Sequence, residues 1–261
     1  MKQLKNYIKG FMKYKDLLKE LVARDIKIRY RRSVLGMFWT ILNPILMMCV
    51  FTVVFSRLFR SDIDNFTIYF LCGNVLWSFM TESTNNALNS IVGNQSLIKK
   101  VYIPKYFFPL SKVLSSLVNL FFAYIAMMIV MLVTKTPFSA TMLLSVLPIF
   151  YVMLFSIGLG MCLAAWMVFF RDVFQLYSVI TLAWMYLTPM FYPASLLEEV
   201  LPAALRWNPM YHYITYLRCL VLERKIPGIA ENMICLAFSV TIFLIGLRIF
   251  YKKQDKFILY I

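Results

Sequence analysis

Acidic residues, histidine and charge in general are scarce in this chain. Asp and Glu together number 12 of 261 residues, there is one histidine, and charged residues make up 15%, against roughly 25% in soluble domains. Apolar residues make up 61%. A chain of this composition cannot hide its apolar surface from water. We therefore expect an integral membrane protein that forms one bundle, with no second sizeable soluble domain.

Sequence motifs for the common catalytic and metal sites are also absent. The chain contains no GxxxxGK[ST], HExxH or GxSxG, so it cannot by itself bind and hydrolyse ATP in the P-loop manner. Its five cysteines form no CxxC or Cys/His pattern, and four lie inside apolar segments, which argues against a disulfide framework and a metal site. His212 lies between two tyrosines, where an interfacial histidine is more often a hydrogen-bonding anchor than a base. We expect neither an enzyme nor a cofactor in this chain.

Most of the charged residues are basic, and the net charge of the chain is +15. The 27 Lys and Arg residues lie mostly at the ends of apolar runs, so anionic lipid head groups are the expected partner rather than nucleic acid. Ser33–Ser56 follow a dense basic cluster and comprise 24 residues without a charge. At about 1.5 Å per residue they extend about 36 Å, more than the roughly 30 Å hydrocarbon core. The cluster consists of Arg24, Lys27, Arg29, Arg31 and Arg32.

The predicted fold is an all-α integral membrane protein with six transmembrane helices and both termini in the cytoplasm. Residues 1–32 form a cytoplasmic region with an amphipathic interface helix, residues 33–251 the transmembrane domain, and residues 252–261 a cytoplasmic tail. The cytoplasmic segments then carry 20 of the 27 basic residues, as the positive-inside rule requires. A cleavable signal peptide is not expected, because the first apolar run starts after more than 30 residues. The predicted spans are residues 33–56, 66–90, 109–134, 142–168, 173–192 and 232–251.

Two predicted segments do not cross the bilayer. The helical spacing of Lys2–Val22 places apolar residues on one face and lysines on another, as in a helix that lies at the membrane interface; a solvated helix packed on a partner is the alternative. Residues 193–231 lie outside and contain Asn208-Pro209, a favourable helix start. A helix from Pro209 to Leu222 is only about 21 Å long, so we expect re-entrant outer helices between spans five and six.

Polar side chains form a stripe on the inner half of the second span. Glu82, Asn85, Asn86 and Asn89 follow the spacing i, i+3, i+4, i+7 and share one helix face. An ionisable group at that depth should face a cavity or a neighbouring helix. A hydrogen-bonded seam between helices is at least as plausible as a role in transport.

Three further patterns concern helix packing. Asn43-Pro44 lies near the middle of the first span, and the carbonyl freed by proline must meet protein or water. Small residues recur every fourth position in the fourth span, at Ser156, Gly160 and Ala164, which lets two helix backbones approach closely. In the fifth span, Tyr177, Trp184 and Phe191 lie seven residues apart. They indicate either aromatic packing between helices or a path for a sugar-bearing substrate.

The order and spacing of several motifs resemble the permease subunit of ABC exporters for lipid-linked polysaccharides, which include O-antigen, capsule and teichoic acid chains. The resemblance extends over essentially the whole chain. It is carried by RDIKIRYRRSVLGMFWTILNP, LIKKVYIPKYFFPLS, FFRD and WNPMYHY, in that order.

This resemblance implies a homodimer of permeases in the bacterial inner membrane, with two copies of a separate ATPase subunit that binds ATP and Mg. It implies a channel lined by aromatic residues of the first and fifth spans, with Phe38, Trp39, Tyr177, Trp184 and Phe191 as candidates. It also implies a coupling helix that docks on the ATPase. That helix maps to a short basic segment without acidic residues: Asn94, Gln95, Ser96, Leu97, Ile98, Lys99, Lys100, Val101 and Tyr102.

Two alternative functions are compatible with parts of this pattern. An exporter of drugs or small lipids would share the six spans but would need no aromatic passage for sugars. A membrane-embedded transferase acting on polyprenyl-linked sugars would need acid and base groups in one cavity. Glu82 and His212 are predicted near opposite faces of the membrane, which counts against the transferase.

Overall fold

The computed structural model describes residues 14–30, 36, 38–55, 65–101 and 103–260, and within these ranges every regular element is helical. The predicted all-α class is thus confirmed at this level. The long helices are α2 (Lys15–Tyr30), α3 (Phe38–Phe55), α4 (Phe66–Leu88), α6 (Phe107–Val133), α7 (Val146–Phe169), α8 (Val173–Tyr186) and α12 (Ile229–Lys253). The shorter helices are α5 (Gln95–Lys100), α9 (Ala194–Val200), α10 (Pro202–Arg206), α11 (Pro209–Arg218) and α13 (Phe257–Tyr260).

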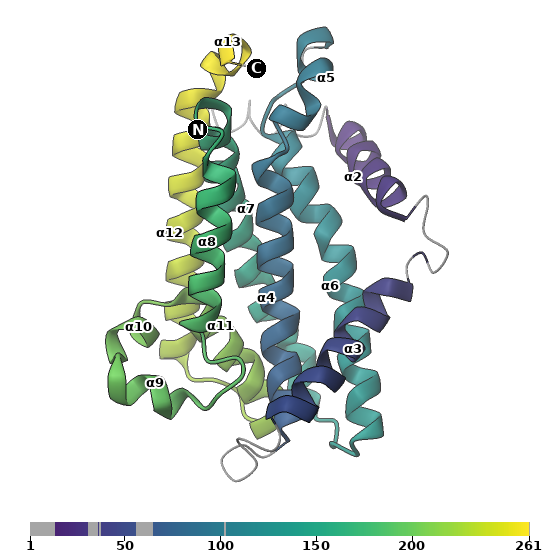
Figure 1. Ribbon diagram of the computed structural model, residues 1–261, viewed down its shortest axis with the longest axis vertical. Helices are drawn as coiled ribbons and strands as arrows, with labels where there is room; N and C mark the ends of the chain where they lie inside the picture. The colour runs from purple at the N-terminus through teal and green to yellow at the C-terminus, as the bar shows by residue number, and fades with distance from the viewer. Residues whose placement is uncertain (1–13, 31–35, 37, 56–64, 102, 261) are drawn as a thin grey trace.

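The long helices run side by side in an elongated bundle (Figure 1). Helices α12, α7 and α8 form one side, α4 lies in the middle, and α6 and α3 form the other side, where α2 lies obliquely across one end. Helices α5 and α13 lie at that end, and α9, α10 and α11 at the opposite end. Within the described residues, three helical segments are long and apolar enough to cross a membrane, namely Phe107–Val133, Ala140–Phe169 and Ile229–Tyr260.

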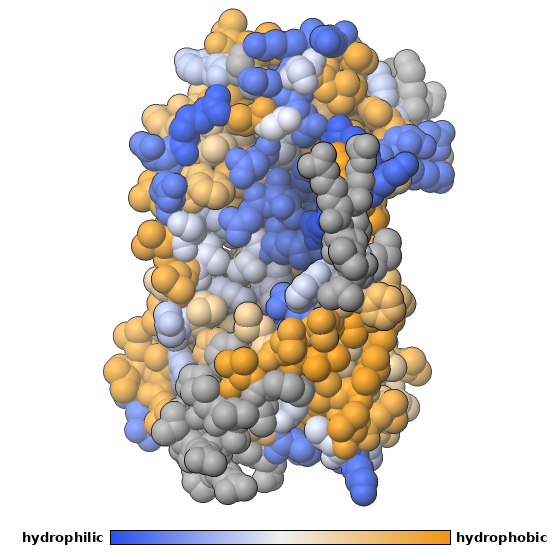
Figure 2. Space-filling model, turned by 45° about the vertical axis from the view of Figure 1, so that its right-hand side comes forward, coloured by the Kyte–Doolittle hydropathy of each residue, from blue (hydrophilic) through white to orange (hydrophobic). Residues whose placement is uncertain are grey.

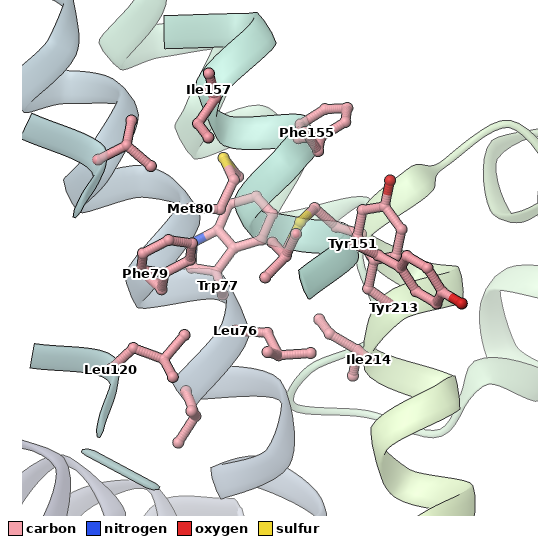
Figure 3. Close-up of a cluster of buried hydrophobic side chains, with 14 of the residues drawn as sticks. Leu76, Trp77, Phe79, Met80, Leu120, Tyr151, Phe155, Ile157, Tyr213 and Ile214 are labelled. Carbon is pink, nitrogen blue, oxygen red and sulfur yellow. The ribbon is translucent and has the colours of Figure 1, made fainter. Parts of the chain in front are cut away.

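Helix α4 is the centre of the packing. It contacts α6, α7 and α11, and 15 of its 23 residues are buried. Figure 3 shows Trp77 and Met80 of α4 turned towards α7, which carries Phe155 and Ile157. The apolar core therefore follows the length of one central helix.

The closest helix contact joins α7 to α12 and depends on two glycines. A Cβ added to Gly158 would lie 2.4 Å from the backbone oxygen of Ile242, and one added to Gly246 would lie 1.9 Å from the oxygen of Gly158. Neither position has space for a side chain. The predicted small-residue stripe mediates a different contact, because a Cβ on Gly160 would lie 2.8 Å from the Cβ of Ala87 on α4.

Helix ends depart from the predicted spans mainly at the fifth span. That span was predicted to reach Tyr192, but α8 ends at Tyr186, because Pro189 lacks a backbone donor and restricts the residue before it. The predicted helix start at Asn208 is confirmed. The Asn208 side chain accepts hydrogen bonds from the amides of Met210 at 3.0 Å and Tyr211 at 3.3 Å.

Helix α2 packs on the first turns of α6. Leu18 and Leu21 of α2 are buried with Phe107 of α6, and the rings of Tyr14 and Phe107 meet edge to face at 6.1 Å between centroids. The predicted amphipathic helix began at Lys2, and its residues 1–13 lie outside the described residues. The described helix continues to Tyr30, so it extends into the basic cluster that precedes the first span.

Candidate functional site

A cavity of about 640 Å³ lies between α2, α3, α4 and α6 and reaches the chain that follows α8. Its wall combines aromatic rings, amides and one ion pair. Figure 2 shows a hydrophilic hollow on this side of the molecule, beside an apolar band. The lining residues are Arg29, Gly36, Trp39, Asn43, Met47, Asn74, Val75, Trp77, Ser78, Phe79, Glu82, Asn119, Leu120, Ala123, Met185, Met190 and Phe191.

Helix α3 contributes one face to this cavity. Trp39, Asn43 and Met47 are spaced by four residues and therefore lie on the same side of the helix, and all three line the cavity. Helix α3 continues through Pro44. The cavity thus borders the Asn43-Pro44 position, where we expect the first span to contact protein or water. Phe38 is 72% exposed and is not among the lining residues.

Glu82 is the centre of the polar contacts in the cavity. Its Oε1 atom accepts hydrogen bonds from Asn119 Nδ2 at 2.6 Å and from Ser116 Oγ at 3.1 Å, both on α6. Arg29 of α2 forms an ion pair with the same oxygen. One carboxylate therefore joins α2, α4 and α6, each contributing polar side chains to a single junction.

The remaining members of the polar stripe are divided between helix contacts and the helix end. Asn86 Nδ2 donates to Ser116 Oγ at 3.4 Å, which extends the contact with α6. Asn85 Nδ2 donates to the carbonyl of Thr81 within α4 at 2.8 Å, and Asn89 is the C-cap residue of α4. The structure thus brings Glu82 and Asn86 together with α6, but Asn85 and Asn89 make no such contact among the described residues.

A second polar cluster connects α2 to the start of the predicted coupling segment. Asp25 Oδ1 lies 2.9 Å from Lys112 Nζ of α6 and 3.2 Å from Arg24 Nη2. Arg24 Nη2 also donates to Asn94 Oδ1 at 3.1 Å. Since Asn94 directly precedes α5, helix α2 makes polar contacts both with this segment and with the cavity.

The predicted coupling segment forms a single short turn of helix. Helix α5 extends over Gln95–Lys100, with Ile98 buried and Lys99 and Lys100 exposed. Ser96 and Val101 are exposed, and Leu97 packs against the core. Tyr102 lies outside the described residues. The segment therefore exposes two lysine side chains, while the buried Ile98 anchors it.

The C-terminal residues lie beside the beginning of α6. Lys105 Nζ donates to the carbonyl of Gln254 at 2.6 Å, and Phe257 meets Phe250 and Phe169 edge to face. Burial lowers the pKa of the Lys105 ammonium, and the nearby Asp255 carboxylate opposes this shift. The end of the chain is thus packed against the same end of the bundle as α5.

The aromatic residues predicted for the fifth span have different surroundings. Tyr177 is 5% exposed, and its hydroxyl lies 2.6 Å from Thr84 Oγ1. Trp184 Nε1 donates to Asn208 Oδ1 at 2.8 Å, and its ring meets Trp77 edge to face. Phe191 lines the cavity and stacks on Phe70. In the single chain, Tyr177 and Trp184 have packing contacts, whereas Phe191 and Trp39 border the cavity.

A buried arginine fixes the segment that follows α8. Arg218 Nη1 donates to the carbonyl of Pro189 at 2.9 Å, and Nε donates to that of Tyr69 at 3.2 Å. Its guanidinium carbon lies 3.3 Å from the centre of the Tyr69 ring. The Tyr69 hydroxyl donates to the carbonyl of Tyr192 at 3.0 Å. These contacts position Met190 and Phe191 at the cavity wall.

Several of these residues were not identified from the sequence. Ser116 and Asn119 had a detectable signal, because they are polar residues within an apolar span. Arg29 was identified only as part of a basic cluster, and Arg218 was not singled out. No local pattern indicates that Arg29 pairs with Glu82, 53 positions away, because tertiary packing creates that contact.

Comparisons with known proteins agree over nearly the full chain. The sequence profile of the family described as ABC-2 type transporter matches residues 16–222. The chain is 30% identical over 253 residues to the O-antigen export system permease protein RfbA of Myxococcus xanthus, covering 96% of this chain and 97% of that protein. It is 28% identical to a protein of the same name from Klebsiella pneumoniae, covering 93% of each. It is 21% identical to the polysialic acid transport protein KpsM of Escherichia coli, covering 94% and 96%.

Proposed function

Because the chain belongs to the ABC-2 type transporter family, we propose that it is the permease subunit of an exporter for polyprenyl-linked polysaccharide of the O-antigen or capsule type. The observation that carries this proposal is the similarity to O-antigen export permeases over 96% of the chain. The chain is a transport permease of the bacterial inner membrane, and ATP is hydrolysed by a separate ATPase subunit.

The proposed assembly contains two permeases and two ATPase subunits, with ATP and Mg bound by the ATPases. The proposed topology has six spans, with α3, α4, α6, α7, α8 and α12 crossing the membrane and both termini in the cytoplasm. Helices α9 to α11 then form the outer re-entrant region. Helix α8 has 14 residues and is about 21 Å long, shorter than the roughly 30 Å core, so residues 187–193 complete this crossing.

The proposed mechanism uses the cavity as part of the glycan path. Aromatic faces such as those of Trp39 and Phe191 pack on sugar rings, and the amides of Asn43 and Asn74 can bond hydroxyl groups. Weak contacts of this kind let a polymer advance. ATP binding closes the ATPase pair, α5 transmits this movement, and the two permeases shift to admit the glycan. Hydrolysis then resets the cycle.

Depletion of this protein in its native cell tests the proposed function. The lipid-linked glycan is located with a membrane-impermeant sugar probe before and after permeabilisation. We expect full-length glycan to accumulate inside and to disappear from the surface. Re-expression of the intact chain should restore surface labelling. Unchanged surface glycan in depleted cells would contradict the proposal and favour export of a small lipid or drug.

A further inference from the structure

We propose that Arg29 binds a phosphate group carried by a lipid, and that Glu82 competes with this phosphate for the Arg29 guanidinium. The inference rests on the proposed export function, because a polyprenyl carrier presents a phosphate next to its first sugar. It assigns an anion-binding role to a residue of α2 that lines the cavity of about 640 Å³.

Charge within the cavity is limited to one pair. Among the described residues that line it, Arg29 is the one cation and Glu82 the one anion, and the two form an ion pair. Both side chains are 32% exposed. An ion pair with this exposure contributes little net free energy, so an anionic ligand can replace the carboxylate at small cost.

Glu82 and Arg29 differ in the contacts that each keeps when their ion pair opens. Glu82 Oε1 keeps its hydrogen bonds from Asn119 at 2.6 Å and Ser116 at 3.1 Å. Within the described part of the chain, Glu82 is the one carboxylate paired with Arg29. Opening therefore leaves the carboxylate satisfied and frees the guanidinium for another acceptor.

The chemistry of the freed group favours phosphate. A guanidinium presents a planar fork of donors that matches two phosphate oxygens, and a diphosphate carries more negative charge than one carboxylate. Trp39 lines the same cavity and is 47% exposed, so a sugar attached to the phosphate can pack on its aromatic face. The cavity thus combines contacts for an anion and for a sugar ring.

Binding of polyprenyl diphosphate to the permease–ATPase complex tests this inference. The complex is placed in nanodiscs of zwitterionic lipid, and bound carrier is measured by native mass spectrometry. Arg29→Gln should weaken binding at least about tenfold, since it removes charge-assisted hydrogen bonds. Glu82→Gln removes the competing charge and should strengthen binding about threefold. Arg29→Lys keeps the charge without the fork and should give an intermediate affinity.

The matched control is Lys27→Gln, which removes the same charge from the same helix at an exposed position that does not line the cavity. Its affinity should stay within about twofold of the wild type. An uncharged polyprenol should bind all variants equally. Competition with phosphatidylglycerol tests which lipid supplies the phosphate. If phosphatidylglycerol displaces the diphosphate at equal concentration, the ligand of Arg29 is a membrane head group.

Two results would overturn the inference. One is an Arg29→Gln complex with unchanged thermal unfolding and wild-type affinity. The other is an equal loss in Lys27→Gln, which would indicate general electrostatic attraction. If Arg29→Gln binds the diphosphate normally while depleted cells lose surface glycan, the phosphate site is contradicted and the export function is not. If depleted cells keep normal surface glycan, the export function is contradicted. The comparison of Arg29 variants then still decides whether Arg29 binds phosphate.

Discussion

The two sides of the bundle are built from different interactions. Helices α7 and α12 meet through glycines whose backbones leave no space for a side chain. Helices α2, α3, α4 and α6 instead enclose a cavity, and their contacts include the polar junction at Glu82. Backbone contacts at van der Waals distance permit one arrangement, whereas polar side chains can exchange partners. We infer that the first side is a scaffold and the second is the side that changes during transport.

The largest effect on stability is expected at the glycine contact. Gly158→Val would place side-chain atoms against the backbone of α12, 2.4 Å away already at Cβ, and should lower the free energy of unfolding by about 3 kcal/mol. Thermal unfolding of the purified protein measures this change. Gly93→Ala is the control, because a Cβ at Gly93 meets nothing within 4 Å. Equal stability of the two variants would show that the α7–α12 contact is not a scaffold.

Trp184→Ala tests whether the predicted channel residue belongs to the scaffold. Its ring contacts Trp77 and Phe155, and its indole donates to Asn208. We expect a loss of about 2 kcal/mol in the free energy of unfolding, measured by chemical denaturation in detergent. Slower export by a variant of wild-type stability would instead assign Trp184 to the glycan path.

Asn208→Ala removes an acceptor shared by the α11 amides and Trp184. Loss of the helix N-cap and of three further side-chain hydrogen bonds, to Trp184, Leu187 and Thr188, should lower the free energy of unfolding by about 2 kcal/mol. Asn208→Asp keeps the capping oxygen but loses the Nδ2 donor to the Leu187 carbonyl and Thr188 Oγ1, so it should recover only part of this loss. Chemical denaturation of the wild type, Asn208→Asp and Asn208→Ala tests whether Asn208 caps α11. An Asn208→Asp variant less stable than Asn208→Ala would contradict this role.

Trp39→Ala should have the smallest effect on unfolding and a clear effect on export. Trp39 is 47% exposed and borders the cavity, so its removal should cost less than about 0.5 kcal/mol. Export is measured as surface glycan at equal protein abundance. Val50→Ala, at another exposed position of α3, controls for lost apolar surface. Full export by the Trp39 variant would remove it from the glycan path.

Charge reversal at Lys99 and Lys100 should leave the unfolding temperature unchanged, because both side chains are exposed on α5. It should lower the amount of ATPase subunit that co-purifies with the permease, if α5 is the docking element. Reversal of Lys252 and Lys253 at the C-terminal end of α12 is the control. Equal co-purification in all variants would exclude α5 from the contact with the ATPase.

Much of the fold could be predicted from the sequence because its cause is local. Apolar runs between basic residues predicted the approximate positions of the long helices α3, α4, α6, α7, α8 and α12, and Asn208-Pro209 predicted the start of α11. The predicted fifth span extends beyond the end of helix α8, because residues 187–192 are mostly apolar and continue the hydrophobic pattern, although Pro189 interrupts the helix. The composition of that segment suits a membrane, but its backbone cannot remain helical.

The candidate site was less predictable, because its contacts join distant parts of the chain. The spacing of Glu82 and Asn86 predicted a common face, and that face meets α6. The partners Ser116 and Asn119 could be proposed from their polarity, but not paired with Glu82. The role of Arg218 could not be predicted, because basic residues are normally exposed to water, whereas this one donates hydrogen bonds to two backbone carbonyls inside the protein.

The glycine contact also has a consequence for biosynthesis. Gly158 and Gly246 are 88 residues apart in the chain, and α12 is the last long helix to be made. The tightest contact therefore cannot form until nearly the whole protein has left the ribosome, because long-range contacts must await the chain between them. Until then, the surface of α7 around Gly158 lacks the α12 backbone that packs against it in the folded protein. A ribosome stalled before α12 should thus leave a permease that has its cavity helices but lacks the contact that completes the bundle.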